Sequence, residues 1–249
     1  MNRILLESSE IRKGVATFGG ARAVHVLEVL HGEIGQVLKT GEIDGRIGTG
    51  EIIGLSASDD DPWVRVRCEH AEESRRPWVD LILAPPRPRV MKRLLPQLAA
   101  IGVGRLVLVG AQKVEKDFWG ATLLKEAIYR PLLIDGLMQA GTSILPTLET
   151  RRNFRRFLRE ELDDMFPGTL RLVAHPAATA TYGDRRQLSA VDGCRRPLLA
   201  IGPEGGWTDD EVQLLESRGF TRHSLGPRIL RTDTATVALL AQLMKEFDR

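Results

Sequence analysis

The residues best suited to chemistry lie in two short loops near the C-terminal end of the sequence. The first loop spans 201–206 (IGPEGG), in which three glycines surround one carboxylate, Glu204. Glycines let the backbone approach a ligand closely, so that backbone N–H groups can face a bound molecule. The pattern lacks the dinucleotide fingerprint and the phosphate-loop lysine, so a tight strand-to-helix turn without a ligand is the alternative.

The second loop spans 225–231 (LGPRILR) and carries Arg228 and Arg231 on either side of two apolar residues. Guanidinium groups can clamp a phosphate or stabilise a developing anion, although single arginines are more often solvated surface charges. Ile229 and Leu230 can pack either on the protein core or against a flat ligand ring. Two arginines in so short a loop make it a second candidate for the site.

Both loops precede helices and follow apolar runs. Thr208 and Glu211 have the spacing of a capping box, and Thr232 is predicted as the N-cap of a long helix over 233–247. Apolar runs at 79–84, 105–110, 170–174, 197–201 and 223–225, with a helix over 90–101, predict repeated βαβ units. Continuous apolar strands imply a parallel sheet covered on both faces.

The N-terminal part follows a different pattern. Residues 35–69 are short apolar stretches broken by glycine and acidic turns, and Val64, Val66 and Cys68 alternate with polar residues as in a half-buried strand. This indicates a small β-barrel or meander. A short helix is predicted over 21–30, with Val24, Leu27 and Leu30 on one face, and the polar segment 72–77 is the best domain boundary.

Composition excludes several classes of protein. The 249 residues are 43% hydrophobic and 27% charged, with a formal net charge of +2, which is typical of globular proteins. No apolar run reaches the roughly 18 residues of a membrane span, and no signal peptide is evident, so we expect a cytoplasmic protein. Cys68 and Cys194 are far apart, and the five histidines lack zinc-site spacing, so no metal is predicted.

Two basic segments are candidates for binding nucleic acid. The first, Arg87, Arg89, Lys92 and Arg93, follows the first apolar run of the α/β half. The second contains five arginines within residues 151–159. Both can contact phosphates, but a charge run is also typical of a solvated helix face.

Taken together, the two glycine- and arginine-containing loops favour a binding site over the ligand-free alternatives. IGPEGGWTDDEV followed by LGPRILRTDTATVALL resembles the C-terminal signature of the RsmE family of ribosomal RNA uridine methyltransferases. The resemblance is strong over 197–245 and weaker through His175-Pro176 and residues 100–103. It implies an α/β fold of two domains: a PUA-like RNA-binding β-barrel over 1–74 and a SPOUT methyltransferase domain with a deep trefoil knot over 75–249.

The resemblance also implies an activity. Such an enzyme uses S-adenosylmethionine to methylate N3 of a uridine in small-subunit (16S) ribosomal RNA and is a homodimer without a metal. Carried over by motif, the cofactor-binding residues are His175, Ile201, Gly202, Gly205, Leu225, Leu230 and Arg231. The catalytic residues would be Glu204, as the base or as a partner of the cofactor's amino group, with Arg228 and Arg231. The RNA-binding residues would be Arg3, Arg87, Arg89, Lys92 and Arg93.

Two departures from the family pattern leave alternatives open. Ala100 replaces a carboxylate and Thr142 replaces an arginine, both in the part expected to meet the substrate. One alternative is a SPOUT methyltransferase with a different RNA target or methylated atom. Another is a non-catalytic RNA-binding factor of ribosome assembly. A nucleotide hydrolase is disfavoured because no phosphate-loop lysine follows either glycine loop.

Overall fold

The computed structural model describes residues 2–58, 60–176 and 196–248, so Cys194 lies outside the described residues. The chain divides into two compact units. Unit 1 comprises Met1–Arg76 and Ile134–Leu145, and unit 2 comprises Pro77–Leu133 and Pro146–Arg249. Within the described ranges, no helix is long and apolar enough to cross a membrane.

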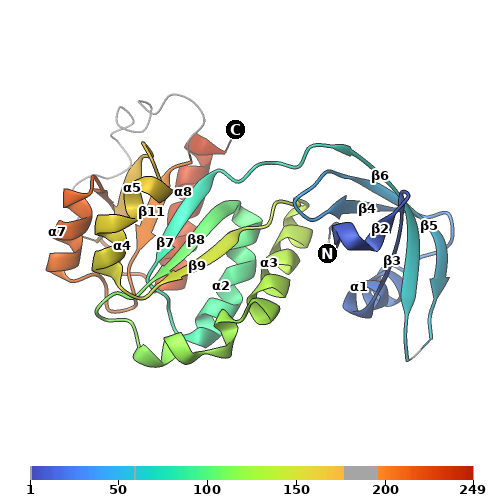
Figure 1. Cartoon of the computed structure of the whole chain (residues 1–249), viewed down its shortest axis with the longest axis horizontal. Helices are drawn as coiled ribbons and strands as arrows, with labels where there is room; N and C mark the ends of the chain where they lie inside the picture. The colour runs from blue at the N-terminus through green and yellow to red at the C-terminus, as the bar shows by residue number, and fades with distance from the viewer. Residues whose placement is uncertain (1, 59, 177–195, 249) are drawn as a thin grey trace. The chain divides into compact units, whose positions relative to one another are not determined.

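Unit 1 contains a six-stranded mixed sheet. Its strands are β1 (Ile4–Leu6), β2 (Ile11–Arg12), β3 (Val15–Gly19), β4 (Val37–Glu42), β5 (Ile47–Ser56) and β6 (Trp63–Glu72), in the order β1-β4-β5-β6-β3-β2 (Figure 1). Only the β1–β4 pair is parallel. The predicted alternation in β6 is confirmed, because Val64 and Val66 are buried in the core while Arg65 and Arg67 are exposed.

The predicted helix over 21–30 was wrong in its buried face. In this stretch the chain forms a single α-turn, α1 (Gly20–Val24), followed by a wider π-turn, η2 (His25–Val29). A separate short helix, η1 (Ser8–Glu10), lies earlier, between β1 and β2. Ala23 and Val26 are buried, whereas Leu30 is 38% exposed. Because the π-turn changes the angular spacing of side chains, a face drawn with regular α-helical spacing does not match the core.

Residues 134–145 join unit 1 through hydrogen bonds to the N-terminal sheet. They include the end of α3 (Glu126–Ala140), which begins in unit 2. The Arg3 guanidinium donates to the carbonyl oxygens of Gly141 (3.0 Å), Thr40 (2.6 Å) and Gly48 (2.9 Å). Burial lowers the pKa of Arg3. Arg3 therefore ties a distant chain segment to the sheet.

Unit 2 is a parallel α/β sheet. Its strands are β7 (Val79–Leu83), β8 (Val103–Val109), β9 (Thr147–Arg151), β10 (Arg171–Ala174), β11 (Leu198–Ile201) and β12 (Thr221–His223), in the order β12-β10-β11-β7-β8-β9. Within its described residues, and besides the start of α3, this unit contains the helices α2 (Pro88–Ile101), η3 (Lys116–Gly120), η4 (Thr122–Leu124), α4 (Phe154–Glu160), α5 (Leu162–Met165), α7 (Asp209–Ser217) and α8 (Thr232–Phe247). α4, α5 and α7 lie on one face of the sheet, and α2 packs beside α8 on the other (Figure 1).

Most of the predicted elements of unit 2 are confirmed. β7 is buried along its whole length, as expected for a parallel strand covered on both faces. The capping box of Thr208 and Glu211 is present at the start of α7. The last strand ends at His223 instead of Leu225.

Thr232 was wrongly predicted as an N-cap. It is the first residue of α8, whose N-cap is Arg231 without a side-chain capping bond. The Thr232 hydroxyl instead donates to the carbonyl oxygen of Gly202 at 3.4 Å, joining the two loops singled out in the sequence. The side chain is thus used for a contact between loops.

Candidate functional site

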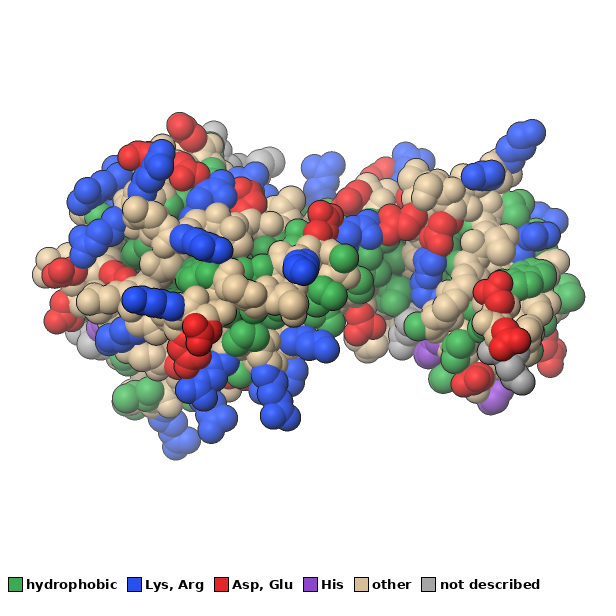
Figure 2. All heavy atoms as spheres, turned by 60° about the horizontal axis from the view of Figure 1, so that its bottom comes forward, with side chains coloured by type: hydrophobic (Ala, Val, Ile, Leu, Met, Phe, Trp, Pro, Cys, Tyr) green, Lys and Arg blue, Asp and Glu red, His purple; other side chains and the backbone are tan. Residues whose placement is uncertain are grey.

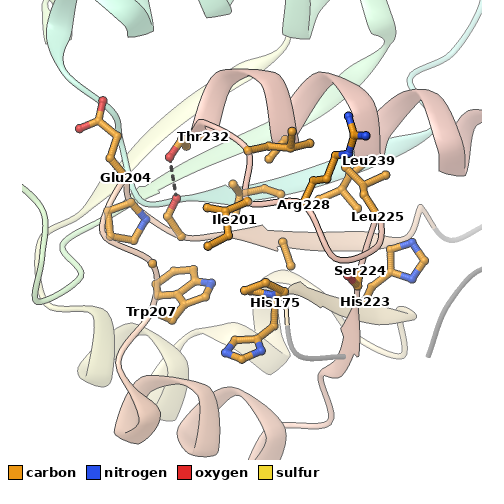
Figure 3. Close-up of a pocket in the computed structure, with 18 of the residues that line it drawn as sticks. His175, Ile201, Glu204, Trp207, His223, Ser224, Leu225, Arg228, Thr232 and Leu239 are labelled. Carbon is orange, nitrogen blue, oxygen red and sulfur yellow. Dashed lines mark hydrogen bonds between the residues drawn. The ribbon is translucent and has the colours of Figure 1, made fainter. Parts of the chain in front are cut away.

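A cavity opens where three neighbouring strands, β10, β11 and β12, reach their carboxyl ends (Figure 3). Its volume of about 340 Å³ falls within the usual range of small-molecule pockets. The carboxyl edge of a parallel sheet is also where α/β folds commonly bind ligands. The walls come from the end of β10, the loop 202–208 after β11, the loop 224–231 after β12, and the start of α8.

The loop after β11 is shaped by glycine and by one aromatic side chain. A Cβ atom on Gly202 would lie 3.1 Å from the Trp207 ring, so any side chain at this position would press against that ring. Gly206 has a φ of +70°, a conformation that favours glycine. The Trp207 ring stacks on Phe154 with centroids 5.1 Å apart and lines the cavity. The glycines therefore keep backbone at the cavity wall.

Glu211 anchors the same loop from beneath. Its carboxylate is 4% exposed and accepts the backbone N–H of Gln112 at 2.8 Å and that of Thr208 at 2.9 Å. Lys113 adds a third tie, because its Nζ donates to the carbonyl oxygen of Gly205 at 2.7 Å. The loop after β8 and the loop after β11 are thus held together by one carboxylate and one ammonium group.

The loop after β12 presents apolar side chains. Ile229 is 89% exposed, and Leu225 and Leu230 are partly exposed at the cavity. Arg228 lines the cavity, but its guanidinium is turned away from the centre (Figure 3). Arg231 is exposed at the start of α8 and is not among the lining residues.

Two histidines line the cavity. His223 is 6% exposed, and its Nε2 lies 3.2 Å from Oε1 of Gln242. Burial lowers the pKa of His223. The pKa of His175 is also lowered, first by burial and then by the nearby charge of Arg222. Both rings are therefore neutral near pH 7, which suits a cavity for a ligand that itself carries positive charge.

The structure brings together most of the residues singled out in the sequence. Six of the seven expected cofactor-binding residues line this cavity, namely His175, Ile201, Gly202, Gly205, Leu225 and Leu230. Glu204 and Arg228, which were expected to be catalytic, line it as well. The Glu204 carboxylate points away from the cavity (Figure 3). Arg89, Lys92 and Arg93 lie on α2, and Arg3 lies in unit 1, where it binds backbone carbonyl groups.

Sequence reasoning missed several residues of the site. Trp207, His223 and Thr232 line the cavity, and Lys113 supports its glycine loop. Trp207 follows the glycine loop directly, and that position was the one available signal. Among the described residues, no group of three or more histidine, cysteine, aspartate or glutamate side chains could hold a metal ion.

Comparison with known proteins identifies the family of this chain. Residues 72–244 match the family model described as "RNA methyltransferase domain". A ribosomal RNA small subunit methyltransferase E of Treponema pallidum is 30% identical over 98% of this chain and 91% of its own length. The chain belongs to the RsmE family. A second RsmE protein, from Borreliella burgdorferi, is 23% identical over 96% of this chain and 95% of its own length.

Solved structures share the fold of this RsmE-family chain. A putative methyltransferase of Legionella pneumophila, solved with bound S-adenosylmethionine, has a TM-score of 0.76 and 26% identity, covering 98% of this chain and 97% of its own. The methyltransferase E of Neisseria gonorrhoeae, solved with S-adenosylmethionine, has a TM-score of 0.75 and 22% identity, covering 99% and 98%. The α/β fold predicted from the sequence is confirmed.

Proposed function

We propose that this RsmE-family chain transfers a methyl group from S-adenosylmethionine to N3 of a uridine in small-subunit ribosomal RNA. The observation that carries the proposal is the cavity at the ends of β10, β11 and β12, whose wall contains the glycine loop 202–206. The Legionella and Neisseria relatives, both solved with this cofactor, support the choice of methyl donor.

The residues of the cavity fit the proposed cofactor. The buried Nε1 of Trp207 has no hydrogen-bond partner among the described residues, and Gly202 leaves room beside that ring. We propose that the cofactor is held by His175, Ile201, Gly202, Gly205, Leu225 and Leu230, with Arg231 at the exposed start of α8. The bound cofactor supplies an electrophilic methyl group on a sulfonium.

The chain's own residues must control one proton and one negative charge. Uracil N3 reacts only after losing its proton, and the resulting anion needs stabilisation. We propose Glu204 as the proton acceptor and Arg228 and Arg231 as positive charges that favour the developing anion. Since the Glu204 carboxylate points out of the cavity, the uracil would approach from the far side of the glycine loop (Figure 3).

The RNA must also be held by its backbone. On the face drawn in Figure 2, Lys and Arg side chains (blue) are spread widely over unit 2. We propose that Arg87, Arg89, Lys92 and Arg93, which are all exposed, contact the RNA, the last three through its phosphates. Arg3 would contribute indirectly, because its guanidinium already binds three carbonyl groups within unit 1.

The family resemblance supports further parts of the proposal. We propose a PUA-like RNA-binding domain over 1–74 and a SPOUT domain with a deep trefoil knot over 75–249. The end of the first segment of unit 1 at Arg76 supports a boundary in this region. The exposed Ile229 and Leu225 beside the cavity support a homodimer, which sedimentation equilibrium would test. We also propose a cytoplasmic location, because ribosomal RNA is the proposed substrate.

The direct test is methyl transfer in vitro. Small ribosomal subunits from a strain lacking the gene are incubated with the purified protein and isotopically labelled S-adenosylmethionine, and digested nucleosides are analysed by mass spectrometry. We expect labelled 3-methyluridine from one position. Label in another nucleoside would favour a different RNA target or atom, to which Ala100 and Thr142 point. Cofactor binding without any transfer, or no binding, would contradict the proposal.

A further inference from the structure

A second hollow lies on the other side of the glycine loop. It opens at the carboxyl ends of β7, which lies beside β11, and of β8, the next strand in the sheet, and encloses about 60 Å³. Its lining residues come from three loops: Pro85, Pro86, Arg87, Lys113, Val114, Glu115, Phe118, Pro203, Glu204 and Gly205. Pro203, Glu204 and Gly205 line both this hollow and the larger cavity. The same loop therefore borders both.

The hollow combines an apolar floor with charged groups at its rim. Pro85, Pro86 and Phe118 are buried, whereas Arg87 and Glu204 are exposed. Arg87 Nε donates to Oε1 of Glu115 at 2.9 Å. The pKa of Arg87 is raised, chiefly by this hydrogen bond and also by the negative charge of Glu204.

Lys113 occupies the opposite rim. Its side chain crosses the face of Gly205, where an added Cβ would lie 2.9 Å from the lysine Cδ, and its Nζ donates to the Gly205 carbonyl oxygen. The charged groups of the hollow are two cationic donors, Arg87 and Lys113, and two carboxylates. Glu115 already pairs with Arg87 Nε, and Glu204 stands on the loop that both hollows share.

Arg87, Lys113 and Glu204 together offer the donors and the acceptor that the edge of one nucleobase requires. Uracil presents O2, N3–H and O4 in the order acceptor, donor, acceptor, and proteins read such edges in RNA by hydrogen bonds from splayed-out bases. Cytosine presents an acceptor at N3 and a donor at N4, so a carboxylate and one of the cationic donors would both be mismatched. Adenine places a donor at N6 and an acceptor at N1, which suits the set no better.

We propose that this hollow is the uracil-recognition subsite, in which Arg87 and Lys113 donate to the two carbonyl oxygens and Glu204 accepts from N3–H. The inference rests on the proposed function and names the residues that select the base. Pro85 and Pro86 would support the ring edge. In the reaction, the N3 proton passes to the Glu204 carboxylate, and the N3–C bond forms as the methyl–sulfur bond of the donor breaks.

The rim groups can exchange their present partners at low cost. The Arg87 and Glu115 side chains are 67% and 54% exposed, and ion pairs so exposed contribute little to stability. The Lys113 bond to Gly205 lies at the surface and uses one of the three N–H donors of the ammonium group, so the others can donate to a base carbonyl. The hollow is shallow, so the base would enter edge first and leave its sugar outside.

The test compares Lys113→Met with Lys116→Met. Methionine keeps the aliphatic stem over Gly205 and removes the donor, while Lys116 lies in the same connection, outside the lining of either hollow. For Lys113→Met we expect kcat/KM for methyl transfer to small subunits to fall about 10- to 100-fold, the usual effect of losing a hydrogen bond from a charged group. The affinity for S-adenosylmethionine, measured by calorimetry, should stay within about 3-fold, and Lys116→Met should match the parent.

The cofactor titration separates base recognition from support of the loop. If Lys113 only positions Gly205, the variant would lose cofactor affinity and transfer rate by the same factor, and the proposal would be overturned. Full transfer activity in the variant would overturn it as well. Failure of the parent protein to bind the cofactor or to methylate RNA would instead refute the proposed function, so the two failures are distinguishable.

A cofactor-free readout tests the choice of base. Uridine 5′-monophosphate and cytidine 5′-monophosphate are titrated into the parent and the Lys113→Met variant, and binding is followed by saturation-transfer NMR. We expect stronger saturation of the uridine nucleotide by the parent and loss of that difference in the variant. Equal saturation of both nucleotides by the parent would contradict uracil recognition here.

Discussion

The two sides of the loop after β11 differ in the kind of group that they offer. The side facing β10 and β12 is a cavity walled by glycine backbone, the Trp207 ring and neutral histidines. The side facing β7 and β8 is a shallow hollow rimmed by Arg87, Lys113 and Glu204. A cavity of backbone and rings suits a cofactor held by shape, whereas charged side chains suit a substrate that must be recognised and deprotonated. In this account, the loop after β11 contacts the cofactor on one side and the uracil base on the other.

The largest expected effect comes from closing the cofactor side alone. Gly202→Val places methyl groups against Trp207, where even a Cβ atom would lie at 3.1 Å. We expect affinity for S-adenosylmethionine to fall about 100-fold or more, because the cavity wall must either shift or fill the space. Calorimetric titration measures this. Gly120→Val, at a position where an added Cβ would meet nothing within 4 Å, serves as the control. Unchanged affinity in Gly202→Val would place the cofactor elsewhere.

A second prediction concerns RNA binding beyond the hollow. Replacing Arg89, Lys92 and Arg93 on α2 by alanine should weaken RNA binding and reduce the slope of log affinity against log salt by about 2 to 3, close to one for each phosphate that is no longer neutralised. Filter binding at several salt concentrations measures the slope. Replacing Arg155 and Arg156, which already pair with Asp210 and Glu160, should change it much less. Equal slopes for parent and triple variant would remove α2 from the RNA surface.

A third variant weakens both sides at once. Glu211→Ala leaves the N–H groups of Gln112 and Thr208 without their buried acceptor, so we expect a loss of about 3 kcal/mol in the free energy of unfolding. Urea denaturation measures it. Glu216→Ala, on the exposed face of the same helix, removes only a surface pair with Arg222 and should change stability little. Similar stabilities for both variants would show that the carboxylate is not the anchor of the loops.

The smallest expected effect is a dependence on pH from the cofactor side. The pKa of His223 in the folded protein lies below its ordinary value of about 6.5, so the unfolded chain takes up the proton first. Stability should therefore be unaffected above that pH and fall as the pH drops below about 6.5. In His223→Gln, the melting temperature should fall less between pH 7 and pH 5 than in the parent. Part of the fall should remain, because the pKa values of His70 and His175 are also lowered. A fall as steep as in the parent would exclude His223 as a source.

The parts of the fold that sequence predicted are those governed by local pattern. Buried parallel strands appear as continuous apolar runs, so β7, β8, β10 and β11 were located. β9 was missed because it is a polar edge strand with alternating charged residues and little burial. The first strands of unit 1 are short, and their partners lie far along the chain.

Contacts between distant residues could not be predicted in the same way. Lys113 reaches Gly205 across 92 positions, and Glu211 reaches Gln112 across 99. Glu211 was interpreted only as a capping residue, which it is, but the second half of its role depends on the fold. The two loops were assigned to the cofactor through family resemblance, since glycine spacing alone does not distinguish a binding loop from a turn, and that assignment stays a prediction. The side of the loop to which Glu204 points required the structure.

Hydrogen–deuterium exchange tests the two-sided account most directly. S-adenosylmethionine is added to the protein, and then RNA, with exchange followed by mass spectrometry after each addition. We expect the cofactor to slow exchange in 202–208 and 224–231 while 87–93 and 112–118 stay unchanged, and RNA to slow exchange in the latter two segments. Protection of 112–118 by the cofactor alone, without protection of 224–231, would contradict the assignment of the two sides.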